Sequence, residues 1–266
     1  MSHDAWDPSQ YDRFKSERQA PFFDLLALIK PVPGGRVLDL GCGTGELTRH
    51  LHQHTQAAVS VGIDSSSAML AKAQAHASAQ VQFRSGDLAA MQEVAGYDVI
   101  AANASLHWVP DHPRVLAAWT RALRPGGQLA VQVPANPDHP SHTTIEELMH
   151  EEPFRSAFAE APPPDPLHNL LTPERYAELL DTLGYRQQHV RLQVYGHHLK
   201  DTTEVVEWIK GTAMTRVRGP LEKRDPALYE RFVVRYRERL LQRLGLRAPF
   251  FYPFKRILFW AQRPQE

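Results

Sequence analysis

The sequence predicts an α/β protein built on a doubly wound, mostly parallel sheet, and two observations predict it. First, short apolar runs alternate with amphipathic stretches from residue 36 to residue 133, which is the pattern of strands joined by helices. Second, the first apolar run ends in three alternating glycines and then a helical pattern, as strands do at the nucleotide-binding corner of such sheets. The length of 266 residues does not decide between one large domain and two small ones.

The glycine-rich stretch follows an apolar run at 37–40 and contains Gly41, Gly43 and Gly45. Glycine suits backbone that takes a positive φ or lies close to a ligand. Dinucleotide sites favour G-x-G-x-x-G, whereas this chain has G-x-G-x-G with Asp39 two residues before the first glycine. A carboxylate there repels a pyrophosphate and attracts a cation, so S-adenosylmethionine, with its ammonium and sulfonium groups, suits the site. The alternative is that Asp39 only caps a turn and the glycines form only a tight loop.

Two further carboxylates follow the next predicted strands. Asp64 ends the run 59–64, nineteen residues past Gly45, and an acid at the end of the second strand reaches the ribose hydroxyls of an adenosine. The alternative is that Asp64 only caps the following helix. Asp87 follows a third strand at 81–83, where a carboxylate can accept a hydrogen bond from the exocyclic amine of adenine.

A fourth predicted strand at 97–102 ends in polar residues, at the edge where open α/β sheets bind ligands. Asp111 is expected to cap the next helix, and residues 128–133 form a fifth strand. The residues that follow the fourth strand and are candidates for the site are Asn103, Ser105, His107 and Trp108.

This order of motifs resembles the class I S-adenosylmethionine-dependent methyltransferases over residues 36–133. Four more specific stretches resemble the trans-aconitate 2-methyltransferase family: Trp6 to Arg18, Ile63 to Ser66 with Met69, Asn103 to His112, and Leu129 to Pro134. One departure is Thr44, where that family often has proline, and this side chain can vary without altering cofactor chemistry.

The resemblance implies a Rossmann-like class I methyltransferase with a seven-stranded, mostly parallel sheet, an antiparallel last strand and a helical cap insertion. We expect the last two strands at 190–199 and 256–261, and two helices between them, at 204–214 and from Asp225 to Leu244. The expected organisation is an N-terminal lid segment at 1–35, a cofactor-binding core at 36–133, and the rest of the sheet with its cap (about 203–244) in 134–266, all in one compact domain.

The resemblance also implies the reaction, which is esterification of a small polycarboxylic acid with S-adenosylmethionine as the cofactor. A carboxylate is already ionised at neutral pH, so it needs no general base, and no catalytic residue is assigned beyond positioning. The expected cofactor-binding residues are Asp39, Gly41, Gly43, Gly45, Asp64, Ser65, Met69, Asp87, Leu88, Asn103 and Ser105.

The acceptor brings spectator carboxylates, which arginine binds best because its guanidinium matches them in a bidentate fork. Residues 203–266 carry fourteen Lys and Arg against seven Asp and Glu, a net charge of +7, whereas residues 1–202 carry a net charge of −7. This bias favours an anionic partner, and the alternative is an ordinary solvated helix surface. The expected substrate-binding residues are Tyr11, Arg18, His107, Trp108, Arg216, Arg218, Tyr236 and Arg256, with His107 and Trp108 near the reaction centre. For Trp108 and each arginine, core packing or surface exposure is the alternative.

Other classes of protein are disfavoured. The histidines lack metal-site spacing, the one cysteine gives no internal disulfide, and neither a signal peptide nor an apolar run of eighteen residues is present. We therefore expect no metal, no membrane association, a cytoplasmic location, and a monomer or weak homodimer. A nucleic-acid methyltransferase is disfavoured because the fourth strand lacks an Asn/Asp-Pro-Pro-aromatic turn. A methyltransferase for another small molecule or natural product, and a non-catalytic S-adenosylmethionine sensor, stay open.

Overall fold

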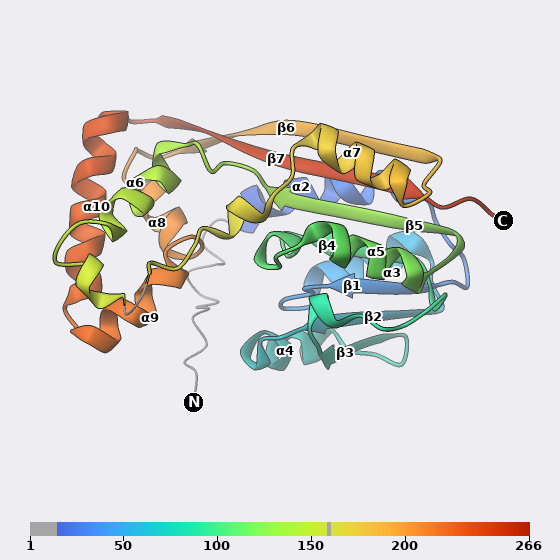
Figure 1. Ribbon diagram of the computed structural model, residues 1–266. Helices are drawn as coiled ribbons and strands as arrows, with labels where there is room; N and C mark the ends of the chain where they lie inside the picture. The colour runs from blue at the N-terminus through green and yellow to red at the C-terminus, as the bar shows by residue number, and fades with distance from the viewer. Residues whose placement is uncertain (1–14, 159–160) are drawn as a thin grey trace. The chain divides into compact units, whose positions relative to one another are not determined.

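A seven-stranded open sheet organises the protein, whose computed structural model describes residues 15–158 and 161–266, with side chains from Gln19 onward. The strand order is β3-β2-β1-β4-β5-β7-β6 (Figure 1). The strands β1 to β5 pair in parallel, β7 is antiparallel to β5, and β6 is antiparallel to β7. The expected seven-stranded, mostly parallel sheet with an antiparallel last strand is therefore confirmed. The strands are β1 Arg36–Leu40, β2 Val59–Asp64, β3 Val81–Ser85, β4 Tyr97–Asn103, β5 Leu123–Pro134, β6 Gln187–Leu199 and β7 Phe250–Gln262.

Helices connect the strands. The α-helices are α2 Lys15–Leu26, α3 Glu46–Thr55, α4 Ser67–Ala73, α5 His112–Ala122, α6 Pro140–Met149, α7 Pro173–Thr182, α8 Glu204–Lys210, α9 Thr215–Arg224 and α10 Leu228–Leu244. Short 3-10 helices are η1 Gln74–His76, η2 Leu88–Ala90, η3 Leu106–Trp108, η4 Arg155–Ala157 and η5 Pro166–Asn169. The helices α3, α4 and α5 each follow a strand of the parallel part, which is the doubly wound pattern.

Local sequence signals explain where two helices begin. The side chain of Asp111 accepts a hydrogen bond from the backbone N–H of Arg114 at the start of α5. The hydroxyl of Thr172 accepts one from the N–H of Arg175 at the start of α7, and Pro173 occupies the first helical turn. Each cap satisfies a backbone donor that has no partner within its helix, and the helix start predicted at Asp111 is confirmed.

The insertion between β6 and β7 differs from the sequence prediction. It contains three helices, α8, α9 and α10, rather than the two that we expected. The predicted helix at 204–214 ends at Lys210 because Gly211, a poor helix former, takes the C-cap position. Thr212 then donates its hydroxyl to the carbonyl of Trp208, which competes with helix continuation. The chain turns there and starts α9 at Thr215.

The chain divides into two compact units, each with its own apolar core. We call Arg18–Ala135, Asn169–Gln193 and Lys255–Glu266 the sheet unit; its core includes Leu38, Ile100 and Phe259. We call Asn136–His168 and Val194–Phe254 the helical unit; its core includes Ile145, Trp208 and Phe232. The strands β6 and β7 run through both units.

Membrane spans and metal clusters are both absent from the described part of the chain. None of its helices has the length and apolar character needed to cross a membrane. Within the same residues, no three His, Cys, Asp or Glu side chains are grouped so that they can hold a metal ion. The absence of a metal requirement stays a prediction.

Candidate functional site

The loop after β1 has the backbone that its glycines predict. Gly41, Gly43 and Gly45 all have positive φ, at 78°, 54° and 79°. The N–H groups of Gly41 and Cys42 both donate to the carbonyl of Ile63 in β2, over 2.8 and 3.0 Å. The loop is therefore fixed to the neighbouring strand by its backbone.

The three glycines differ in what a side chain would meet. A Cβ on Gly41 would lie 2.3 Å from the Cβ of Ser105, and one on Gly45 would lie 2.6 Å from the ring of Phe83. A Cβ on Gly43 would meet nothing within 4 Å. Gly41 and Gly45 are thus required by packing inside the protein, whereas Gly43 is the position where the loop is open to a ligand.

Asp64 holds the loop and the next helix together. One carboxylate oxygen accepts from the N–H of Gly43 at 2.9 Å, and the other accepts from the N–H of Ser66 at 2.9 Å. Ser66 is the N-cap of α4, so Asp64 binds the capping residue and is not the cap itself. A carboxylate accepts about four hydrogen bonds, so these two contacts leave lone pairs for a ligand.

Asp39 is a buried carboxylate directly below the loop. It is only 5 % exposed, and the hydroxyl of Thr48 in α3 donates to it at 2.6 Å. Burial raises the pKa of Asp39 to about 6; the hydrogen bond from Thr48 lowers it, and the negative charge of Asp64 raises it further. The two carboxylates thus make the local electrostatic potential more negative, and a cation bound there would reduce the repulsion between them.

Four further predicted cofactor residues follow β2 and β3 in the sequence. Ser65 is exposed, and Met69 is buried in α4. The exposed Asp87 caps η2 by accepting from the N–H of Ala89 at 2.8 Å. Leu88 packs against the core of the sheet unit, and its carbonyl accepts from the indole of Trp119. The structure leaves Asp87 with acceptor capacity beyond its cap.

The carboxyl end of β4 carries the other predicted polar residues. The hydroxyl of Ser105 donates to the carbonyl of Leu40 at 2.6 Å, which fixes the end of β1. His107 is buried in η3, and the amide of Asn169 donates to its carbonyl. The ring of Trp108 lies 5.0 Å from that of His107 and is 38 % exposed, so the alternative that Trp108 is a core residue is wrong.

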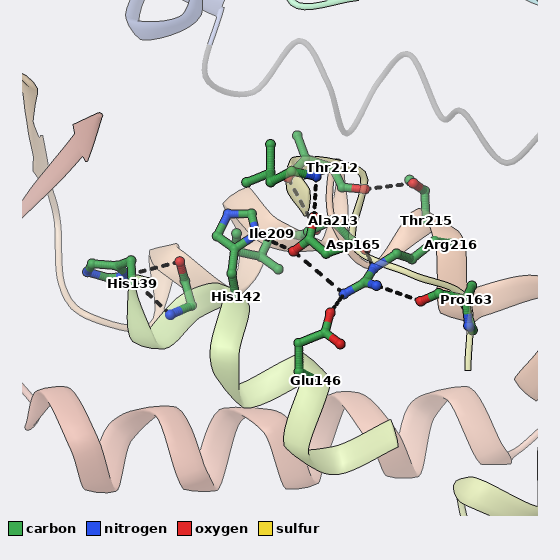
Figure 2. A network of polar contacts seen from close by, with 12 residues as sticks. His139, His142, Glu146, Pro163, Asp165, Ile209, Thr212, Ala213, Thr215 and Arg216 are labelled. Carbon is green, nitrogen blue, oxygen red and sulfur yellow. Dashed lines mark hydrogen bonds and ion pairs between the residues drawn. The ribbon is translucent and has the colours of Figure 1, made fainter. Parts of the chain in front are cut away.

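Arg216 lies in a buried polar network of the helical unit (Figure 2). Its guanidinium donates to the carbonyls of Pro163 and Ala213, forms an ion pair with Glu146, and lies 3.7 Å from a carboxylate oxygen of Asp165. The Arg216 side chain is only 5 % exposed. Most of its donors are therefore used inside the protein, which does not favour direct binding of an acceptor.

The carboxylate of Asp165 links this network to a histidine. His142 contacts Asp165 through Nδ1 at 3.3 Å, on the side opposite Arg216 (Figure 2). Burial alone would raise the pKa of Asp165, but the hydrogen bond and charge of His142, and the charge of Arg216, hold it at about 2. Asp165 is thus an ionised anchor for both side chains.

Two other predicted acceptor residues of the helical unit also have protein partners. Arg218 is about half exposed and forms an ion pair with Glu222, one turn further along α9. Tyr236 is fully buried, and its hydroxyl donates to the carbonyl of Ser141 at 2.8 Å. Burial raises the pKa of Tyr236, so it stays a neutral donor.

The basic bias of the C-terminal region has a structural explanation. The helix α10 carries many of these arginines, and acidic residues of α6 and the turn after it face them. Arg243 pairs with Glu147 at 2.7 Å, and Arg239 pairs with Glu151. Ion pairs this exposed add little stability, but they neutralise charge that the sequence suggested was available to a partner.

Three predicted acceptor residues remain. Arg256 lies in β7 opposite Pro134 of β5 and is 5 % exposed. Tyr11 and the side chain of Arg18 lie outside the residues that the structure describes. Two polar residues near the site were not identified from the sequence: Thr48, which donates to Asp39, and Gln132 in β5. A polar residue inside the apolar run 129–133 was the available signal for Gln132.

Removing the charge of Asp39 is predicted to stabilise the ligand-free protein. Its folded-state pKa of about 6 lies above the ordinary value near 4, so the folded protein binds an extra proton between these pH values. Stability therefore falls as pH rises through this window, and the penalty is complete above pH 6. A shift of about two units corresponds to about 3 kcal/mol, so Asp39→Asn is expected to gain up to about that amount at pH 7.5 and to lose this pH dependence.

Urea unfolding at pH 5 and pH 7.5 measures this effect. The control is Asp181→Asn, because the Asp181 carboxylate is 70 % exposed and its removal should change stability by less than about 0.5 kcal/mol. An Asp39→Asn protein less stable than the wild type at pH 7.5 would contradict the prediction.

Comparison with known proteins agrees with the geometry. A family model described as a methyltransferase domain matches residues 37–127. Among solved structures, a putative methyltransferase from Bacillus halodurans has a TM-score of 0.57 at 14 % identity, covering 92 % of this chain and 99 % of that one. A phosphoethanolamine N-methyltransferase of Haemonchus contortus, solved with S-adenosyl-L-methionine, has a TM-score of 0.54 at 18 % identity, covering 96 % of this chain and 59 % of that one. These two structures share the fold.

Curated relatives are much closer in sequence. A trans-aconitate 2-methyltransferase of Deinococcus radiodurans is 44 % identical over 98 % of this chain and 99 % of its own length. Enzymes of the same name from Streptomyces avermitilis and Mycobacterium tuberculosis are 38 % and 34 % identical, each over 97 % of this chain, and over 97 % and 96 % of their own lengths. Similarity of this extent, together with the glycine loop and its carboxylates, shows that the chain belongs to the trans-aconitate 2-methyltransferase family.

Proposed function

We propose that the protein transfers the methyl group of S-adenosylmethionine to a carboxylate of trans-aconitate, forming a methyl ester. The names of the full-length relatives support this acceptor. The observation that carries the proposal is the open position at Gly43, beside two carboxylates that have no cation of their own among their described contacts. The main alternative is methyl transfer to another small molecule or natural product.

The residues present fit the cofactor. S-adenosylmethionine would supply an electrophilic methyl group on a sulfonium, whose sulfur would keep the electron pair of the broken C–S bond and leave as a neutral thioether. In the proposed role, the negative potential of Asp39 and Asp64 attracts its positive charges, and the free lone pairs of Asp64 accept from the ribose hydroxyls. Gly43 allows close approach of the backbone, since a side chain would occupy that space. Asp87 is proposed to accept from the adenine amine.

The protein's task is to position an acid that is already nucleophilic. The acceptor carboxylate has an unperturbed pKa near 4 and is ionised at neutral pH. Holding oxygen, methyl carbon and sulfur in line supplies on the order of 7–11 kcal/mol of barrier reduction. His107 and Trp108, at the end of β4, are proposed to help orient the acceptor, and Arg256 is proposed to balance its spectator charge. Arg216 and Arg218 are also proposed to contact the acceptor, although each has an ion-pair partner in the protein.

The variant Gly43→Ala is predicted to lose cofactor affinity in addition to the stability that its positive φ costs. Its methyl group would occupy the open space of the loop, and the positive φ costs about 1–2 kcal/mol in strain. Gly34→Ala is the control, since Gly34 also has a positive φ of 74° and an added Cβ there would meet nothing within 4 Å, but it lies in the loop before β1.

Calorimetry with S-adenosylhomocysteine and thermal unfolding measure the two effects. Both variants should lose similar stability, whereas only Gly43→Ala should weaken binding, by about tenfold or more. Equal affinities in the two variants would mean that the cofactor does not approach Gly43.

A methyl-transfer assay tests the acceptor directly. Labelled S-adenosylmethionine is incubated with trans-aconitate, other di- and tricarboxylates, and neutral acceptors of similar size. We expect base-labile methyl incorporation into trans-aconitate, with a higher kcat/KM than for the other acids, because only an ester is hydrolysed by mild base. Transfer to a neutral acceptor alone, or no transfer to any acid, would overturn the proposed function.

A further inference from the structure

Polar residues form a row on one face of the sheet, at the carboxyl end of its central strands. Side chains of a strand alternate between faces, and the core of the sheet unit contains Leu38 and Leu40 of β1, Ala102 of β4, Val131 and Val133 of β5, and Ile257 of β7. The residues next to them therefore point to the other face. We define the polar row as Asp39, Asn103, Gln132 and Arg256, on β1, β4, β5 and β7 in that order across the sheet.

Gln132 has no protein partner for its side chain among the residues described. It is fully buried, at 0 % exposure, and neither its amide oxygen nor its amide nitrogen has a hydrogen bond. Because both ends are unpartnered, this does not depend on which end is the oxygen. The neighbouring Asn103 pairs with Gln132 in the β4–β5 register, and its buried Oδ1 is also without a hydrogen bond.

A second glutamine of β5 makes the hydrogen bonds that are usual for a buried amide. Gln128 lies four residues earlier, on the same face of β5, and is 1 % exposed. Its oxygen accepts from the N–H of Lys30 and the indole of Trp260, and its nitrogen donates to the carbonyl of Lys30. Buried amides are normally satisfied in this way, so the unsatisfied Gln132 has hydrogen-bonding groups available to a ligand.

Charge along the polar row indicates what that ligand is. The carboxylate of Asp39 lies below the glycine loop at one end, and the guanidinium of Arg256 lies on β7 at the other. Gln132 is on β5, which lies next to β7 and two strands from β1. At the usual strand spacing, β5 and β1 are about 10 Å apart. Gln132 therefore lies toward the basic end, where an amide N–H suits an acid rather than the positively charged part of the cofactor.

We propose that Gln132 is an acceptor-binding residue whose amide N–H donates a hydrogen bond to a carboxylate of the acid that is methylated. This inference rests on the proposed function. The methionyl part of the cofactor also carries a carboxylate that Gln132 could bind. Measuring acceptor binding and cofactor binding independently distinguishes the acceptor carboxylate from the cofactor carboxylate.

The test compares Gln132→Met with Gln128→Met, two variants with the same apolar replacement on the same strand and face. For each, kcat and KM are measured with trans-aconitate, the dissociation constant of S-adenosylmethionine by calorimetry, and Tm by thermal unfolding. Gln132→Met should raise KM about tenfold, leave cofactor affinity within about twofold, and keep or raise Tm. Gln128→Met should lower Tm by several degrees and leave KM unchanged, since it removes satisfied hydrogen bonds.

Three results would overturn the inference. These are an unchanged KM in Gln132→Met, a loss of cofactor affinity that matches the rise in KM, and a lower Tm with normal kinetics. Gln132→Asn, which keeps the amide but shortens the side chain, is the second variant if the methionine protein does not fold, and it too should raise KM. Wild-type protein that turns over no carboxylic acid overturns the proposed function as well, whereas normal wild-type turnover with normal variant kinetics overturns only the inference.

Discussion

Buried negative charge at the carboxyl end of β1 is the constraint on which the rest of the site depends. Asp39 is buried, accepts one hydrogen bond from Thr48, and lies near a second carboxylate, Asp64. Such an arrangement is unfavourable in the ligand-free protein, because burial disfavours a charged carboxylate. It becomes favourable when a cation binds beside it. Burial of the charge thus destabilises the ligand-free protein, and binding of a positively charged methyl donor can offset this destabilisation.

The parallel sheet brings these groups together from distant parts of the sequence. The carboxyl ends of neighbouring parallel strands lie at one edge of the sheet. The residues after β1, β2, β3 and β4 are therefore placed at that edge by the strand pairing itself. The alternation of side chains then separates two tasks. One face of each strand belongs to the apolar core, and the other face carries the polar row that ends at Arg256. In the proposed function, the acidic end of this arrangement binds the donor and the basic end binds the acid.

Much of the cofactor half was predictable because its signals are local. Glycines with positive φ, an acid at a strand end and cap residues before helices each depend on a few neighbouring residues, and the structure has the predicted backbone at Gly41, Gly43 and Gly45. The acceptor half was less predictable because its contacts are non-local. Nothing near Arg216 in sequence indicates that Glu146 and Pro163 bind it, and the charge of α10 does not reveal its partners in α6. Gln132 required knowledge of its spatial neighbours, because only they show that it is unsatisfied.

The pH dependence of S-adenosylmethionine binding tests the central claim most directly. If the donor binds against the ionised form of Asp39, its dissociation constant should fall as pH rises from 5 to 7.5, with a midpoint near the pKa of about 6. The same calorimetric titration of Asp39→Asn should show weaker binding and no such change. A dissociation constant of the wild type that is constant over this range would contradict the claim that a buried carboxylate recognises the cationic donor.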